Sequence, residues 1–171
     1  MAKPLDQNGL MTYAAQALSA RALTVAELRE KLKRRAADPA DVDHVLACLK
    51  DRGYLNDQRF AESYANWRRD DGGFGKTRVQ RDLMARRVAP AIAKQAAEAA
   101  YKEADEVAMI EQFLARKYRG KDLGALLKEP KQLASAYRKL RTSGFSTGNS
   151  VKVLKRYADQ MELLEDTEEE M

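Results

Sequence analysis

An internal repeat is the feature of this sequence that most restricts its possible folds. Four pairs of residues at matching places in two apolar patterns lie 51 positions apart, namely Thr24 and Gly75, Leu28 and Val79, Leu32 and Leu83, and Pro39 and Pro90. A weaker third copy follows the second after about 57 positions. Apolar residues recur at helical spacing in each copy, without the sustained alternation that strands need. The sequence therefore predicts an all-α protein: three tandem three-helix repeats stacked into an elongated, curved, right-handed or solenoid-like array.

Helix-boundary signals divide this repeat pattern into segments. Thr24 and Glu27 have the spacing of a capping box. Asp38 followed by Pro39 is typical of a helix start, and Gly53 is typical of a helix end. The predicted segments are a flexible leader (1–9), repeat 1 (10–55), repeat 2 (56–102), repeat 3 (103–159) and an acidic tail (160–171). Nine helices are predicted, and residues 120–130 are expected to form a loop. Residues 102–105 contain no helix breaker, so the sixth and seventh helices could be one continuous helix.

One stretch, from the end of the first repeat into the second, resembles a known family. The residues that carry the resemblance are Gly53-Tyr54-Leu55-Asn56-Asp57, Arg59-Phe60-Ala61, Arg68, Phe74-Gly75, Arg78-Val79 and Asp82-Leu83. Their order and spacing resemble the signature of the RecX regulatory proteins, bacterial modulators of the RecA recombinase. Asp71-Gly72-Gly73 is a small insertion relative to that pattern, and a weaker resemblance covers about residues 10–159.

The charge of the chain favours a polyanionic partner. All 31 Lys and Arg residues precede residue 162, whereas six of the 26 acidic residues follow residue 161, which leaves a net charge of +11 on residues 1–161. Such a balance is typical of proteins that bind a nucleic acid or a nucleoprotein, although it also serves solubility alone. The tail is interpreted as solubilising sequence; the alternative is that it folds back on the basic surface.

The sequence offers no constellation for catalysis, a metal or a cofactor. One cysteine, Cys48, and one histidine, His44, exclude an internal disulfide and a zinc-type cluster. His44 is interpreted as a surface residue and Cys48 as packing at the edge of a core. The run from Gly72 to Thr77 imitates only the end of a phosphate-binding loop, and a helix rather than a strand precedes it. We therefore expect a protein that is not an enzyme.

Aromatic side chains of the second repeat are interpreted as core. Phe60, Tyr64 and Trp67 share one helix face, where packing is favoured over base stacking by Trp67. Tyr54 is expected to lie against the following helix. Arg68 lies on the apolar side, so we expect it to extend along the surface and bond helix-end carbonyls or a carboxylate.

The basic residues are the candidate binding surface. Arg78 and Arg81 point away from Val79 and Leu83, and Arg86 and Arg87 flank the helix end, so all four are predicted to be available to a partner. Residues 116–141 are the densest basic stretch, with nine Lys or Arg against two acids. The predicted partner-binding residues are Lys33, Arg34, Arg69, Lys76, Arg78, Arg81, Arg86, Arg87, Arg116, Lys117, Arg119, Lys131, Arg138, Lys139 and Arg141. A solvated helix face is the alternative interpretation of these charges.

The resemblance implies a function exerted by contact. It implies a non-enzymatic regulator that binds the RecA filament on single-stranded DNA and mainly inhibits its ATPase and strand-exchange activities, with weak or indirect contact to the DNA itself. A cytoplasmic monomer without a membrane segment or cofactor is expected. One alternative is a helix-turn-helix-like protein that acts directly on nucleic acid. Another is a scaffold that joins proteins without nucleic acid.

Overall fold

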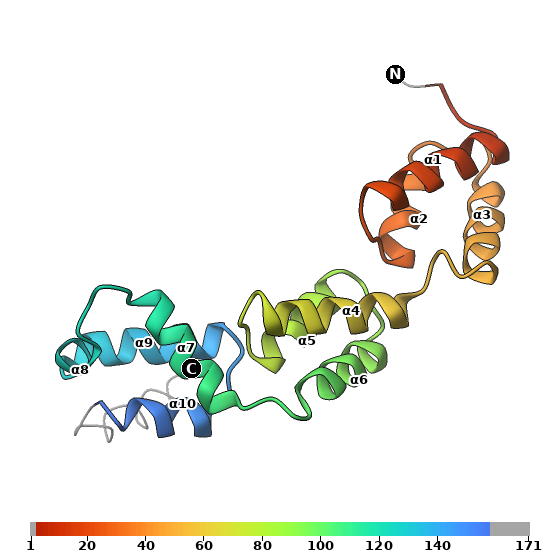
Figure 1. The fold of residues 1–171 in the computed structure, drawn as a ribbon. Helices are drawn as coiled ribbons and strands as arrows, with labels where there is room; N and C mark the ends of the chain where they lie inside the picture. Colours follow the sequence, from red (N-terminus) through yellow and green to blue (C-terminus); the bar gives the residue numbers. More distant parts are fainter. Residues whose placement is uncertain (1–2, 158–171) are drawn as a thin grey trace. The chain divides into compact units, whose positions relative to one another are not determined.

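The computed structural model describes residues 3–157 and shows an all-helical chain (Figure 1). The helices found in this range are α1 (Gln7–Ala20), α2 (Val25–Lys33), α3 (Pro39–Asp51), α4 (Asp57–Asp70), α5 (Lys76–Ala85), α6 (Pro90–Tyr101), α7 (Glu106–Lys117), α8 (Leu123–Leu126), α9 (Pro130–Thr142) and α10 (Thr147–Leu154). Residues 3–157 contain no strand, only an isolated bridge between Leu5 and Ala36. The prediction of an all-α fold is confirmed.

Local capping residues determine where the first helices begin and end. The N–H of Glu27 donates to Thr24 Oγ1 and the N–H of Thr24 donates to Glu27 Oε2, both at 3.1 Å, so the predicted capping box is present. Asp38 caps α3, with Pro39 in its first turn. Gly53 follows α3 with φ +73°, the left-handed conformation predicted for this helix end.

The chain forms two compact units, and each is described by itself. Unit 1 comprises Met1–Tyr64 and Arg81–Ala96, and unit 2 comprises Ala65–Gln80 and Ala97–Met171. The division falls within α4, α5 and α6, the helices of the second repeat. In unit 1, α1, α2 and α3 pack on one another around fully buried residues that include Leu10, Leu28 and Val45 (Figure 1). In unit 2, α7, α9 and α10 surround a second core that includes Leu114 and Phe145.

The helix α4 buries small side chains rather than its aromatic ones. Ala61 and Ala65 are fully buried. Phe60 and Tyr64 are half-buried and stack with ring centroids 6.0 Å apart, while Trp67 is 51% exposed. The prediction that Trp67 packs in a core was therefore wrong. Alanines spaced four residues apart bring a helix close to its neighbours, so the wider aromatic rings remain at the edge of the contact.

Other local predictions need correction as well. Tyr54 is 67% exposed and does not lie buried against α4. Within the predicted loop 120–130 the four-residue helix α8 begins after Asp122, which accepts from the N–H of Ala125. The helices α6 and α7 are separate, because Asp105 caps α7 in extended conformation. Residues 5–9 are ordered parts of the fold: Leu5 pairs with the backbone at Ala36, and α1 begins at Gln7.

The acidic tail 160–171, and with it the role predicted for it, lies outside the described residues. Of the helices in residues 3–157, none combines the length and the apolar character that crossing a membrane requires.

The N-terminus of α2, in unit 1, is contacted by residues from outside its own repeat. We call this contact the Thr24 junction (Thr24, Val25, Glu27, Asp57 and Arg86). Thr24 Oγ1 donates to the carbonyl of Arg86 (3.0 Å), and the N–H of Val25 donates to Asp57 Oδ1 (2.8 Å). The Arg86 guanidinium donates to both carboxylate oxygens of Glu27 at 2.8 and 2.9 Å. Asp57, at the start of α4, and Arg86, directly after α5, therefore complete the first turn of α2.

A corresponding contact occurs in unit 2 at the N-terminus of α5, and we call it the Gly75 junction (Gly75, Thr77, Ser143 and Gly144). The N–H of Gly75 donates to the carbonyl of Ser143 (2.8 Å), and the N–H of Thr77 donates to that of Gly144 (3.3 Å). A Cβ atom on Gly75 would overlap the backbone of Gly144. By the repeat offsets Thr24 matches Gly75 and Arg86 matches Ser143, so both junctions use equivalent positions.

Candidate partner-binding surface

The predicted basic residues fall into groups that belong to the two units. Lys33, Arg34, Arg81, Arg86 and Arg87 lie in unit 1. Unit 2 holds Arg69, Lys76, Arg78, Arg116, Lys117, Arg119, Lys131, Arg138, Lys139 and Arg141. Most are exposed, but several make internal contacts that a helical wheel does not reveal.

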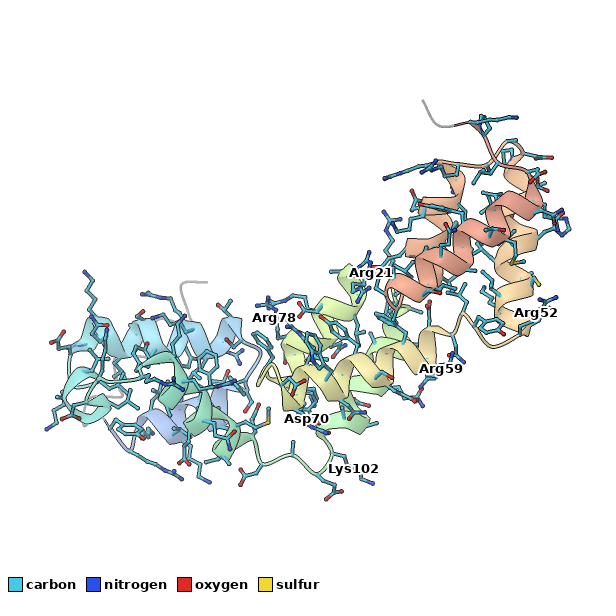
Figure 2. All side chains as sticks on the ribbon, turned by 45° about the horizontal axis from the view of Figure 1, so that its top comes forward. Arg21, Arg52, Arg59, Asp70, Arg78 and Lys102 are labelled. Carbon is cyan, nitrogen blue, oxygen red and sulfur yellow. The ribbon has the colours of Figure 1, made fainter. Side chains whose placement is uncertain are left out.

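In unit 1 residues of α2, of the end of α5 and directly after α5 border an open pocket of about 350 Å³, here called the α2–α5 pocket. It is lined by Arg21, Glu27, Glu30, Lys31, Arg34, Ala85, Arg86 and Arg87. Arg21, labelled in Figure 2, follows α1 and is exposed. Five cations thus face two carboxylates, and the pocket carries an excess of positive charge.

Arg86 is the structural anchor of this pocket. Besides its two hydrogen bonds to Glu27, its guanidinium lies 4.4 Å from the ring centroid of Phe60 and 5.7 Å from that of Tyr64. Burial opposes ionisation of Glu27, but the hydrogen bonds from Arg86 and Thr24 and the charges of Arg86 and Arg21 outweigh it, so the pKa of Glu27 is below its ordinary value. Arg86 is therefore held inside the fold, contrary to the expectation that it is available on the surface.

In unit 2 the residues around Phe74 form a layered cation–aromatic group, the Phe74 cluster (Trp67, Arg68, Phe74, Arg78 and Tyr101). The guanidinium of Arg68 lies 4.1 Å from the Phe74 centroid and 5.6 Å from that of Trp67, and Arg78 lies 5.4 Å from the Phe74 centroid. The Tyr101 hydroxyl donates to the carbonyl of Phe74, and burial raises the Tyr101 pKa despite nearby arginines. Aromatic rings are thus prominent neighbours of Arg68.

Arg78, labelled in Figure 2, also takes part in the packing of unit 2. Its Nη1 donates to the carbonyl of Thr142 (3.3 Å). The prediction that Arg78 simply projects away from the protein was therefore wrong, whereas Arg81 is exposed as expected. Lys76, at the start of α5, is exposed as well.

Arg69 and Arg116 border another hollow of unit 2, of about 300 Å³. Arg69 pairs with Asp70 (2.6 Å) and donates to the carbonyl of Ala100; the hydrogen bond raises the Arg69 pKa and lowers that of Asp70. The guanidinium of Arg116 occupies the space where a side chain at Gly73 would be.

The basic residues after α7 and along α9 are mostly exposed. Arg116, Lys117 and Arg119 are exposed at the end of α7, and Lys131 and Arg138 are exposed on α9. Two further members of α9 make internal contacts. Lys139 donates to the hydroxyl of Tyr118 (3.3 Å), and Arg141 donates to the carbonyl of Phe145 (2.6 Å). At the end of α2, Lys33 and Arg34 are exposed.

Sequence reasoning missed residues that the structure adds to these groups. Arg21 and Lys31 line the α2–α5 pocket, and Trp67 is accessible beside Arg68. Arg21 follows a helix and precedes the capping box by three residues, a place from which a side chain can face the next helix start. Nothing in the local spacing distinguished Trp67 from a core residue.

In residues 3–157 no group of three or more His, Cys, Asp or Glu side chains could hold a metal ion. His44 is exposed, as expected of a surface residue, and Cys48 is half-buried, as expected at the edge of a core.

Solved structures share this fold. A crystal structure of RecX from Lactobacillus salivarius superposes with a TM-score of 0.68 at 20% identity, covering 88% of this chain and 96% of the other. A crystal structure titled regulatory protein RecX superposes with a TM-score of 0.71 at 18% identity, covering 88% of this chain and 73% of the other. These similarities concern the fold.

Fold and surface define the class: an all-α protein of tandem three-helix domains with exposed basic faces. Sequence models of RecX match here, its first three-helix domain at residues 11–49 and its second at 56–96. The regulatory protein RecX of Amycolatopsis mediterranei is 30% identical over 87% of this chain and 85% of its own length, and that of Deinococcus radiodurans is 36% identical over 85% and 66%. The chain belongs to the RecX family of regulatory proteins. It spans slightly less than two thirds of the Deinococcus protein.

Proposed function

We propose that this chain is a non-enzymatic regulator that binds the RecA recombinase filament on single-stranded DNA and lowers its ATPase and strand-exchange activities. The observation that carries the proposal is membership of a family whose named members are regulatory proteins. The excess of cations on residues 1–161 supports binding to a filament that exposes phosphates. We place this function in the cytoplasm and assign it to the monomer, whose mass light scattering would check.

The contacts of the basic residues suggest two roles, direct binding for some and structural support for others. Exposed cations such as Arg34, Lys131 and Arg138 are proposed to contact the filament. Those with internal hydrogen bonds, Arg86 and Arg141 among them, are proposed to hold the exposed ones in place. Charge reversal of the first group should change binding, while loss of the second should change stability first.

The test is the ATPase rate of RecA on single-stranded DNA as this protein is titrated. We expect the rate to fall, and we expect a Lys131→Glu/Arg138→Glu variant to need more than tenfold higher concentration for the same effect at moderate salt. Lys50→Glu, an equal change of charge per site at an exposed position of α3, is the control and should act like the wild type. The difference should narrow as salt screens the charges.

The single tryptophan gives an independent readout. Trp67 is 51% exposed in the Phe74 cluster, so a filament that covers this cluster should change its emission. An unchanged ATPase rate at saturating protein would contradict the proposal. Tight, sequence-selective binding to duplex DNA without recombinase would favour the alternative of a direct DNA-binding protein. Association with a protein partner that ignores salt would favour a scaffold.

A further inference from the structure

Arg87 has a left-handed backbone conformation, which glycine adopts more readily than arginine. With φ +61° it is the non-glycine residue of residues 3–157 that adopts the left-handed region. Its N–H donates to the carbonyl of Met84 (2.9 Å), just past the end of α5. Its counterpart 57 residues later is Gly144, with φ +90° after α9. Glycine adopts this conformation without strain, whereas a side chain opposes it, so an arginine here calls for a role of its side chain.

The α2–α5 pocket supplies such a role, because Arg87 lines it together with the other cations. Of the two carboxylates in the lining, Glu27 is already occupied by two hydrogen bonds from Arg86. Glu30 is held loosely, with its Oε1 3.7 Å from Nη1 of Arg87, and 65% of the Arg87 side chain and 44% of the Glu30 side chain are exposed. Arg21, Lys31 and Arg34 then remain as an excess of positive charge around one opening.

We propose that the α2–α5 pocket binds a phosphate group in the backbone of a single-stranded nucleic acid, and that Arg87 is a direct contact. A guanidinium matches phosphate oxygens with two parallel hydrogen bonds, and the flanking cations release counterions when the strand binds. The volume, about 350 Å³, is at the lower end of the roughly 300 to 1,000 Å³ of small-ligand pockets, enough for a short segment of strand. This inference rests on the proposed function for its choice of polyanion.

The strain makes a sharp test possible. Arg87→Gly removes the side chain and relieves the left-handed backbone, so it should raise the melting temperature by about 2 to 5 °C while weakening DNA binding. The probe is a fluorescent 20-nucleotide oligothymidylate, measured by anisotropy without recombinase between 50 and 200 mM salt. We expect about three- to tenfold weaker binding at the lower salt and a salt slope reduced by about one phosphate contact.

Two further variants bracket this result. Glu30→Gln removes the competing carboxylate and should strengthen binding by about two- to threefold. Lys50→Glu, outside the pocket in the same unit, should change the affinity less than Arg87→Gly does. A melting temperature that falls in Arg87→Gly, or an unchanged affinity and salt slope, would overturn the inference. So would stronger competition by polyglutamate than by unlabelled oligonucleotide, since it would indicate an acidic protein segment as the ligand.

The two proposals fail separately. If Arg87→Gly loses DNA affinity while the wild type leaves the RecA ATPase unchanged, the pocket is supported and the proposed function is wrong. If the wild type inhibits the ATPase and Arg87→Gly binds the oligonucleotide like the wild type, the pocket assignment is wrong and the proposed function stands.

Discussion

The Thr24 junction and the Gly75 junction place equivalent repeat positions in contact, yet they do so with different chemistry. At the first, a hydroxyl, two carboxylates and a guanidinium supply the hydrogen bonds. At the second, backbone N–H groups reach carbonyls directly, because glycines allow close approach. The comparison teaches that a repeat can conserve a geometry without conserving its residues. It also implies that the first junction is sensitive to charge and the second to side-chain size.

The largest effect is expected from Gly75→Ala. The new Cβ would overlap the backbone of Gly144, which cannot rotate away as a side chain can, so about 3 kcal/mol of stability should be lost. Gly148→Ala is the matched control, because a Cβ at Gly148 meets nothing within 4 Å, and it should change stability by less than about 1 kcal/mol. Chemical denaturation measures both. A Gly75→Ala protein as stable as the wild type would show that the close approach is not required.

At the Thr24 junction, Arg86→Ala should cost about 2 kcal/mol. The change leaves Glu27 without its guanidinium and uncovers Phe60, and both side chains of the ion pair are largely buried, with 24% and 22% exposed. A double-mutant cycle with Glu27→Gln should give a coupling energy of about 1 kcal/mol. Arg29→Ala, which breaks the more exposed pair with Asp43, should cost less than about 0.5 kcal/mol. Equal losses in the two pairs would remove the distinction drawn for this junction.

Thr24→Ala tests the hydroxyl alone and should cost about 1 to 2 kcal/mol. Thr24 Oγ1 both accepts from Glu27 and donates to the Arg86 carbonyl, so alanine leaves two groups without a partner. Thr24→Ser keeps the hydroxyl and should recover most of the loss in a thermal melt. If serine is no better than alanine, the methyl group rather than the hydroxyl carries the effect.

The smallest expected effect is a pH dependence confined to the charged junction. The folded pKa of Glu27 is below its ordinary value, so its contribution is complete above about pH 4.3 and is lost as the pH falls through the folded pKa. Glu27→Gln should therefore be less stable than the wild type by about 1 kcal/mol at pH 7, and the two should converge as the pH falls below the folded pKa of Glu27. Parallel stability curves across this range would contradict the assignment.

The features predictable from the sequence are those decided within a few residues. Thr24 and Glu27 form a capping box because three residues separate them in any helix start, and Gly53 ends α3 for a similarly local reason. The buried stripe through Leu28 and Leu83 follows from periodicity. Family resemblance came from the spacing around Gly53 to Leu83, and the sequence models confirm it.

Features that depend on distant neighbours were not predictable in this way. A helical wheel gives the faces of α4 but not which one is covered, and Ala61 and Ala65 are buried where the aromatic face was expected. Arg86 bonds Glu27 across 59 positions, so no local pattern distinguishes it from an exposed cation such as Arg87. The candidate surface was therefore predictable as a set of charges, but not as pockets and clusters.

The completion of α2 by Asp57 of α4 and by Arg86, directly after α5, has a consequence for experiments on fragments of the protein. A fragment that ends at residue 55 would retain Leu10, Leu28 and Val45 in its core, yet it would lack Asp57 and Arg86. The N–H of Val25 and the carboxylate of Glu27 would then form hydrogen bonds with water instead. The first repeat expressed alone would therefore lack the contacts that fix the start of α2 in the intact chain. Binding measured on it would not report the native surface.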